Sequence, residues 1–467
     1  MTDAPKENQV NKSERTTQLI CFALFLVLMF FAIDLRLTAA LDTKVESPIR
    51  ADAKDYFLYA YNLVHHGVYS SDPTAYFSDL SPKPSTAEPQ PSPTLTPDAK
   101  RTPGYALFAA LVMGKDYGKD AVNRVIIWQT IISFLIPLVA FLLTSHFLNR
   151  WWGCASLFFT AISPHLINAN IYYLTESLYG VFVICFLYTF IIALNKQSMK
   201  LILAAGLLLG MAALIRPTLQ YFVVFAWGII WFFPAAGRIR LKLAVIFGLS
   251  FLLIFGGWSM RNYNAIGHLS DPTLTKGTLQ HGMYPNFMYQ DDPKSFGFPY
   301  RFDPTSKETV ASTATVLKEI QRRFKEEPVR HLSWYLWGKP TTLWSWNIIA
   351  GMGDSFIYEV SQSPYFYSKR FQWSRLIAYY SHNTLMILSL ITAIYCWLPI
   401  KKNVLNPNQI WALRVLSAMF FYYTLLHMVA APFPRYSVPM RPINYLLAIA
   451  GVYISHLMAR KAISKKL

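Results

Sequence analysis

The sequence predicts an all-α membrane protein that crosses the bilayer many times. Of its 467 residues, 54% are hydrophobic and only 15% are charged, whereas soluble domains carry about 25% charged residues. Apolar runs of about 20 residues, the length that spans a bilayer as a helix, recur along the chain. The net charge of +18 is spread in short clusters between these runs. A nucleic-acid-binding role is therefore excluded, because it requires basic residues gathered on one soluble surface.

The apolar runs predict about ten transmembrane helices. We place them at 18–41, 125–147, 151–167, 171–194, 201–215, 219–233, 243–260, 376–399, 410–431 and 443–459. The run at 105–113 is too short to cross, so we expect an interfacial or re-entrant helix there. The tryptophan-rich run at 331–349, interrupted by Pro340, is ambiguous.

These runs divide the chain into four parts. A polar leader, 1–17, precedes an N-terminal transmembrane block, 18–260, which includes a long loop at 42–123. A second polar segment, 261–375, is followed by the C-terminal helices and tail, 376–467. We expect amphipathic helices within the two long loops. The first apolar run is too long for the core of a signal peptide, so we expect it to be an uncleaved anchor.

Charge predicts the orientation of these spans. If the N-terminus is cytoplasmic, one end of each helix pair carries basic residues, as cytoplasmic loops do. These are Lys12, Arg15, Arg150, Lys196, Lys200, Arg238, Arg240, Lys242, Lys401, Lys402, Arg460, Lys461, Lys465 and Lys466. With ten spans, both termini are cytoplasmic and both long polar segments face outside.

The segment ADAKDYFLYAYNLVHHGVYS, 51–70, is the centre of the functional prediction. Asp52 and Asp55 are three residues apart, a spacing that places both carboxylates on one side of a helix start. Aromatic residues follow them, and we expect a helix at the membrane surface with its rings half in lipid. Asp52 is a candidate general base, although Asp is also a common helix cap.

Other ionisable residues fall at the predicted outer ends of helices, where such residues tend to be functional. They are Glu176 in YYLTESLYG, Arg216 in LIRPTLQ, Arg261 in WSMRNYNAIG, and Arg435 and Arg441 in PFPRYSVPMRP. Arginine binds phosphate through a planar fork of donors, and a nearby carboxylate accepts a proton from a hydroxyl. The set predicts a site for an anionic, lipid-linked substrate. Ion pairing across helices and anchoring at the interface are the structural alternatives for these residues.

Taken in order, the Asp52 segment, RTPGY, YYLTESLYG, LIRPT, WSMRNY and RYSVPMRP resemble motifs of bacterial GT-C membrane glycosyltransferases. The resemblance covers about 18–460 and is greatest to the group of protein O-mannosyltransferases and aminoarabinose lipid A transferases. It implies inverting transfer of a sugar from a polyprenyl-phosphate carrier to a hydroxyl of a glycan, lipid or protein. It also implies an active site on the periplasmic side of the bacterial inner membrane.

The resemblance assigns roles to individual residues. By position, Asp52 matches the family's catalytic carboxylate, with Asp55 close behind. Where many relatives carry an Asp-Glu pair, this chain has Ala53 after Asp52, so either Asp55 supplies the second carboxylate or the site works with one. The expected substrate-binding residues are Glu176, Arg101, Arg216, Arg261, Lys276, His281, Arg435 and Arg441. The departure at Ala53 leaves a divalent metal ion as an alternative, but we expect no cofactor and no required metal. The four cysteines have no ligand spacing, and the adjacent His65 and His66 point apart on a helix.

Two other functions remain open. An O-antigen ligase or polymerase would use a lipid-diphosphate donor, and such chains also have arginine-rich outer loops. A lipid transporter or flippase would place charges near the bilayer midplane and break its helices in matching halves. The Pro-rich stretch at 81–97 is either a mobile insertion or a lid over the site.

Overall fold

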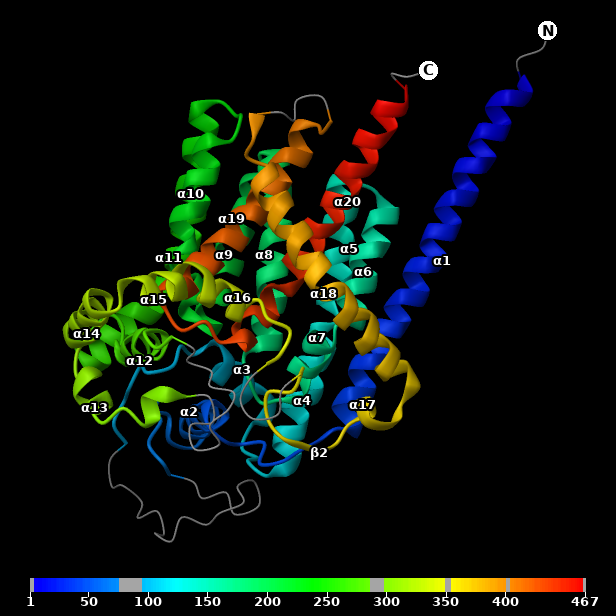
Figure 1. Ribbon diagram of the computed structural model, residues 1–467. Coiled ribbons are helices and arrows are strands. Elements are labelled where there is room, and N and C mark those ends of the chain that lie inside the picture. Colours follow the sequence, from blue (N-terminus) through cyan, green and yellow to red (C-terminus); the bar gives the residue numbers. More distant parts are fainter. Residues whose placement is uncertain (1–3, 75–94, 286–297, 349–353, 400–403, 465–467) are drawn as a thin grey trace.

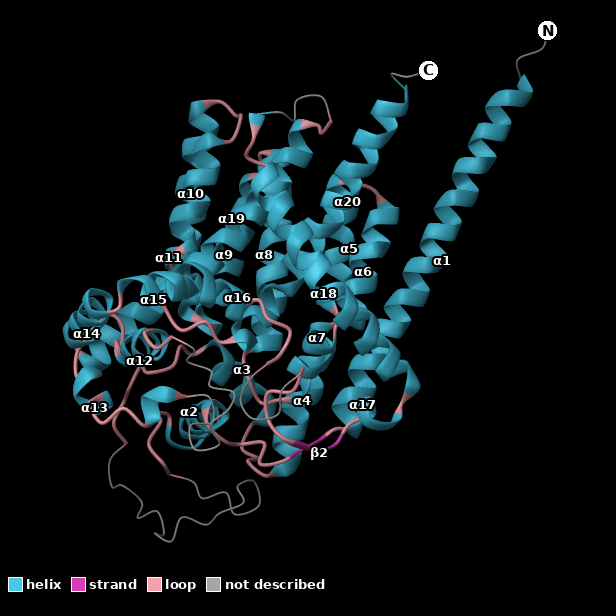
Figure 2. Ribbon diagram, in the orientation of Figure 1, coloured by secondary structure: helices cyan, strands magenta, loops and turns pink. Residues whose placement is uncertain are grey.

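The computed structural model describes residues 4–74, 95–285, 298–348, 354–399 and 404–464. Within these ranges the protein is almost entirely helical (Figures 1 and 2). The strands β1 (Lys44–Val45) and β2 (Val360–Gln362) form one short antiparallel pair that joins the two long polar segments, which we name the outer segments after the side of the membrane predicted for them. Most of the Pro-rich stretch lies outside the described residues, so its role stays a prediction.

Seven helical segments are long and apolar enough to cross a membrane, which confirms seven predicted spans. They are Thr16–Asp42 of α1 (Ala4–Asp42), Lys119–Phe147 (α4, Lys119–Ser133, with α5, Leu135–Phe147), α8 (Glu176–Lys196), α11 (Gly237–Ile266), α18 (Lys369–Tyr395), α19 (Pro407–Val429) and Pro434–Ser464, which contains α20 (Arg441–Ser464).

The other three predicted spans are helices of fewer than 18 residues. They are α6 (Arg150–Ile162), α9 (Met199–Ile215) and α10 (Phe222–Phe232). Helix α9 matches its predicted range, whereas α6 and α10 are shorter than predicted. At 1.5 Å per residue, the 13 residues of α6 reach about 20 Å, less than the roughly 30 Å hydrocarbon core. Helix α6 ends at Ser163 because Pro164 follows, and the chain continues as α7 (Pro164–Asn168). The next span starts at Glu176 rather than at the predicted 171.

The two outer segments form short helices at the end of the bundle opposite both termini (Figure 1). The first holds α2 (Asp52–His66) and α3 (Gly104–Met113), the helix expected from the short apolar run. The second holds α12 (Thr273–Gly282), α13 (Ser306–Thr309), α14 (Thr313–Glu326), α15 (Pro328–Ser333), a π-helical turn (Trp334–Gly338), α16 (Lys339–Leu343) and α17 (Pro364–Tyr367).

The environment of α2 corrects one prediction. Its aromatic residues were expected to lie half in lipid, but Tyr56, Phe57 and Tyr59 are buried in protein. The ring of Tyr56 packs edge-on against Tyr105 of α3 at 5.3 Å, and Tyr59 stacks on Tyr69 at 4.2 Å. This face of α2 is covered by α3 and by the loop after α2, which carries Tyr69. Helix α2 is therefore a core helix, and its first turn is held in place.

Candidate active site

Asp52 is the first residue of α2 and the centre of a charged cluster. One of its carboxylate oxygens accepts a hydrogen bond from Nη2 of Arg101 at 2.7 Å. The other accepts from Nη2 of Arg435, which lies in the 3₁₀ helix Pro434–Met440 before α20. The preceding Ala51 has a φ of 48°, a conformation that costs about 1–3 kcal/mol for a residue other than glycine. The contacts around Asp52 therefore hold a strained turn.

Asp55 lies one turn along α2 and shares Arg101 with Asp52. Its Oδ2 accepts from Nε of Arg101 at 3.0 Å and lies 3.0 Å from Nζ of Lys100. Arg101 thus bridges the two carboxylates with its planar fork, and its guanidinium lies 5.4 Å from the ring centre of Tyr56. The RTPGY motif and the Asp52 segment, separate in sequence, form one unit.

The cluster fixes the protonation state of Asp52. Burial raises the pKa of Asp52, but the charges of Arg435 and Arg101 outweigh burial and hold the pKa well below its ordinary value. The side chain is 26% exposed, so its carboxylate is reachable from outside. Asp52 is ionised at neutral pH, and as it stands it is a weak base, because two guanidinium groups stabilise its charge.

A second ion pair lies beside the first. Glu176 begins α8, is 2% exposed, and lies 3.4 Å from Nη2 of Arg216, which follows α9. The Arg216 guanidinium is 4.6 Å from the ring centre of Tyr436, the residue after Arg435. Burial lowers the pKa of Arg216, but the charge of Glu176 and nearby tyrosines raise it above its ordinary value. Among the described residues, Oε2 of Glu176 and Nη1 of Arg216 have no hydrogen-bond partner.

His281 borders the cluster from the second outer segment. Its ring stacks on Tyr300 at 3.8 Å and lies 6.2 Å from Phe433, two residues before Arg435. Burial, together with the charge of Arg301, lowers the pKa of His281 to about 4, although Asp52 acts in the opposite direction. His281 is therefore neutral at neutral pH.

The structure places the other three predicted site residues elsewhere. Arg261 donates to the carbonyls of Asp98 and Tyr69, at 2.7 and 3.2 Å, and ties the end of α11 to the first outer loop. Lys276 donates to the carbonyl of Ala311 at 3.3 Å. Arg441 is buried and donates to the carbonyl of Ser345 at 2.9 Å. Each of these contacts is to backbone, and a substrate-binding role for Arg261, Lys276 and Arg441 stays a prediction.

Sequence reasoning missed three residues of the cluster. Lys100 precedes Arg101 and pairs with Asp55, while Tyr300 and Tyr436 supply ring faces to His281 and Arg216. Tyr436 was adjacent to a predicted arginine in RYSVPMRP, and that position was its signal. Nothing local in the sequence marked Tyr300.

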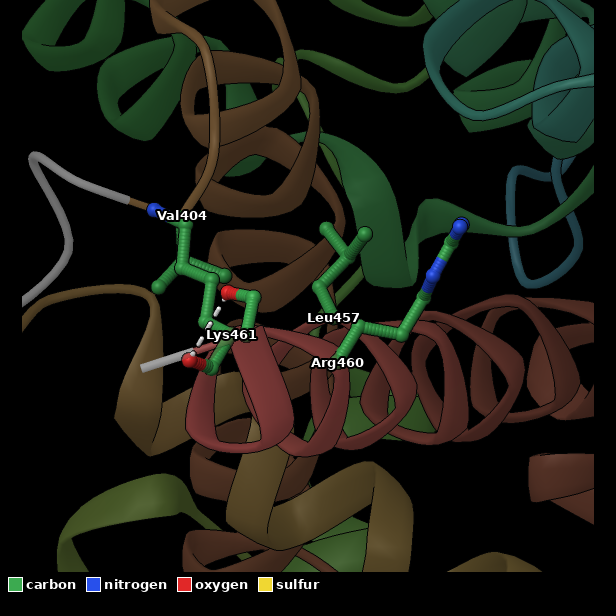
Figure 3. A pocket seen from close by; sticks show the side chains of 5 residues that line it. Val404, Leu457, Arg460 and Lys461 are labelled. Atoms are coloured by element: carbon green, nitrogen blue, oxygen red, sulfur yellow. Dashed lines mark hydrogen bonds between the residues drawn. The ribbon is translucent and has the colours of Figure 1, made fainter. Parts of the chain in front are cut away.

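Two further features bear on the location of the site. Within the described ranges, no three His, Cys, Asp or Glu side chains gather as they would around a metal ion, and independence from metal stays a prediction. A cavity of about 330 Å³ is lined by Val404, Leu457, Arg460, Lys461 and Ser464 (Figure 3). It lies at the C-terminal end of α20, at the opposite end of the bundle from Asp52, so it is not part of this cluster (Figure 1).

Comparison with known proteins shows the architecture. The structure matches archaeal oligosaccharyltransferase AglB from Archaeoglobus fulgidus in complex with an inhibitory peptide and a dolichol-phosphate, with a TM-score of 0.50 and 13% identity. It matches the apo form of the Archaeoglobus fulgidus oligosaccharyltransferase with a TM-score of 0.51 and 14% identity. The chain has a GT-C fold.

This GT-C likeness covers nearly the whole chain but only part of the matched proteins. The two matches include 97% and 96% of this chain and 52% of the archaeal chains, so the protein spans about half their length. No protein-family model and no curated protein matches the sequence. The likeness therefore establishes the fold of this membrane protein, and the charged cluster around Asp52 is the basis for its chemistry.

Proposed function

We propose that this protein is an inverting glycosyltransferase that moves a sugar from a polyprenyl-phosphate carrier to a hydroxyl of an envelope glycan, lipid or protein. The reaction takes place on the periplasmic face of the bacterial inner membrane, with both termini in the cytoplasm. The observation that carries the proposal is the pairing of Asp52 with Arg101 and Arg435, at the start of α2, in a GT-C bundle whose termini lie at the opposite end (Figure 1). The dolichol-phosphate named in the AglB complex supports a lipid-linked donor.

The chemistry follows from the charges of the cluster. The acceptor hydroxyl attacks the anomeric carbon, the bond between that carbon and the phosphate oxygen breaks, and the polyprenyl phosphate leaves with the bonding electrons. Asp52 takes the hydroxyl proton. Arg435 and Arg101 stabilise the charge that develops on the phosphate, as oriented donors do in other transfer reactions.

Donor binding would make Asp52 a stronger base. A phosphate that engages Arg435 removes part of the positive charge now directed at Asp52 and adds negative charge beside it. Both changes raise the pKa of Asp52 towards its ordinary value. The carboxylate thus becomes a competent base only when the donor is in place, which limits wasteful reaction in its absence.

The experiment is a transfer assay with Asp52→Asn. Membranes that contain the wild type or the variant receive a panel of polyprenyl-phosphate sugars, and mass spectrometry follows the products. We expect the wild type to consume one donor and the variant to lose at least about 10²-fold in rate, the lower range for a general base. The matched control is Asp34→Asn, because Asp34 is 25% exposed and pairs with Arg370 at 2.8 Å, away from the cluster.

The outcomes separate the candidate functions. Normal turnover by Asp52→Asn would contradict the assignment of the base and point to Asp55. Consumption of a lipid diphosphate in place of every monophosphate donor would instead support the ligase or polymerase. Movement of an unmodified lipid across the bilayer, without transfer, would support the transporter.

A further inference from the structure

Lys339 is a buried amine outside the charged cluster, and it touches the segment that carries Arg435. It is fully buried, and its Nζ donates to the carbonyls of Met428 and Val429 at 2.9 and 3.2 Å. These are among the last carbonyls of α19, which have no partner within their own helix. Lys339 therefore binds the point at which α19 ends and the connection to Arg435 begins.

A second contact, made by Trp334, reaches the same connection through Gly282. Nε1 of Trp334 donates to the carbonyl of Gly282 at 2.9 Å. Gly282 in turn lies flat against Ala430, because a Cβ on Gly282 would come within 2.5 Å of the Ala430 carbonyl oxygen. Ala431 and Trp334 belong to one small hydrophobic cluster, and Phe433 packs against it.

The backbone just before Lys339 departs from a regular α-helix. Residues Trp334–Gly338 form a π-helical turn between α15 and α16, a form of helix that occurs often at functional sites. Lys339 follows this π-helical turn directly, and its Nζ also lies 3.4 Å from the ring centre of Tyr335. Besides Tyr335, the titratable groups close enough to feel the charge of Lys339 include His331 and His427.

We propose that Lys339 is a positioning residue that, with Trp334, holds the segment 430–434 and thereby sets the guanidinium of Arg435 against Asp52. This inference rests on the proposed function for its kinetic part. The second outer segment, which contributes few groups to the cluster, acts on it through this contact. Loss of the contact lets Arg435 drift from the carboxylate without removing any group that touches substrate.

The protonation state of the lysine is consistent with this role. Burial lowers the pKa of Lys339 to about 6, so at neutral pH the side chain is an amine with two N–H groups and needs no counter-charge. Two N–H groups match the two carbonyls of Met428 and Val429. The contact is thus a pair of hydrogen bonds in a buried site.

The test uses the full chain in detergent or nanodiscs, with Lys339→Met, Lys339→Arg and Trp334→Phe. Hydrogen–deuterium exchange reports on peptide 430–436 without any need for activity. We expect faster exchange of this peptide in Lys339→Met, with α8 unchanged, and partial recovery in Lys339→Arg, which keeps donors. Trp334→Phe keeps an aromatic ring, smaller than the indole, and loses the Nε1 donor, so it tests the same contact if Lys339→Met fails to fold. Lys318→Met on exposed α14 is the control for loss of a lysine.

Kinetics supply the second measurement. A misplaced group of about 1 Å costs on the order of 10²-fold in rate, so we expect kcat of Lys339→Met to fall by up to that factor while the donor KM changes little. Unchanged exchange at 430–436 would overturn the structural part of the inference. Faster exchange with unchanged kcat would overturn the positioning of Arg435. A wild type that transfers no sugar at all would reject the proposed function, and the exchange result would still stand.

Discussion

Arginine is used in two different ways around the carboxylates of this protein. Arg101 and Arg435 hold the partly exposed Asp52, where a phosphate from outside can compete for them. Arg216 holds Glu176 in a buried site, where the pair is removed from water. The first pair is suited to exchange its partner during a reaction, and the second is suited to remain closed.

The buried pair gives a prediction about stability. Glu176→Gln leaves Arg216 buried without its carboxylate, and removal of one partner of such a pair costs about 3–5 kcal/mol. We expect a clear fall in the melting temperature of Glu176→Gln and of Arg216→Met, and a smaller fall in the double variant than the sum of the two. Thermal unfolding in one detergent measures all three.

The control for this cycle is an exposed ion pair. Glu327 and Arg330 lie 2.8 Å apart with side chains about half exposed, and exposed pairs contribute only about 0–1 kcal/mol. Glu327→Gln should therefore leave the melting temperature nearly unchanged. Additive losses in the Glu176 and Arg216 variants would show that the two residues do not stabilise each other.

At the scale of single elements, the end of α12 packs closely against the chain before Arg435. Gly282→Ala places a Cβ against backbone atoms of Ala430, 2.5 Å from the oxygen, and backbone cannot move aside as a flexible side chain does. We expect a lower melting temperature and reduced transfer.

Gly277→Ala is the matched control on the same helix, because nothing lies within 4 Å of its added Cβ. A Gly→Ala change in a helix interior should stabilise by about 0.5–1 kcal/mol. Equal effects of the two substitutions would contradict the close contact.

The elements also show what sequence reasoning supplied. The first turn of α2, with Asp52 and Asp55 on one side, was predicted from spacing, because neighbours three apart on a helix are fixed by its geometry. Burial of Tyr56 and Phe57 was not predicted, since it depends on Tyr105 of α3 and on Tyr173, which precedes α8, packing against them. The hydrogen-bond partners of Asp52 could not be predicted from local sequence patterns either. The sequence placed Arg101 and Arg435 on the outer side of the membrane, but which guanidinium reaches which oxygen depends on three-dimensional packing.

At the scale of the molecule, hydropathy predicted the class and seven of the spans, because bilayer thickness directly sets the length of an apolar helix. It overestimated α6, where Pro164 interrupts an apolar run that is continuous in composition, and α10, which begins only at Phe222, after the 3₁₀ turn Pro217–Leu219. Orientation was predicted from charge alone. The structure places both termini at one end of the bundle and α2, which begins at Asp52, at the other (Figure 1), and which end faces the cytoplasm stays a prediction.

Cysteine labelling tests that orientation. Asp116, with a side chain 71% exposed, lies between α3 and α4 at the Asp52 end, and exposed Arg238 begins α11 at the end that holds the termini. We expect an impermeant maleimide to label Asp116→Cys from the periplasm and to label Arg238→Cys only after the inner membrane is opened, because basic residues such as Arg238 favour the cytoplasmic side. The native cysteines give little background, since three are buried and Cys185 is partly buried. The reverse labelling pattern would place Asp52 in the cytoplasm, where a periplasmic acceptor has no access to it, and the proposed reaction would then need an acceptor on the inner face.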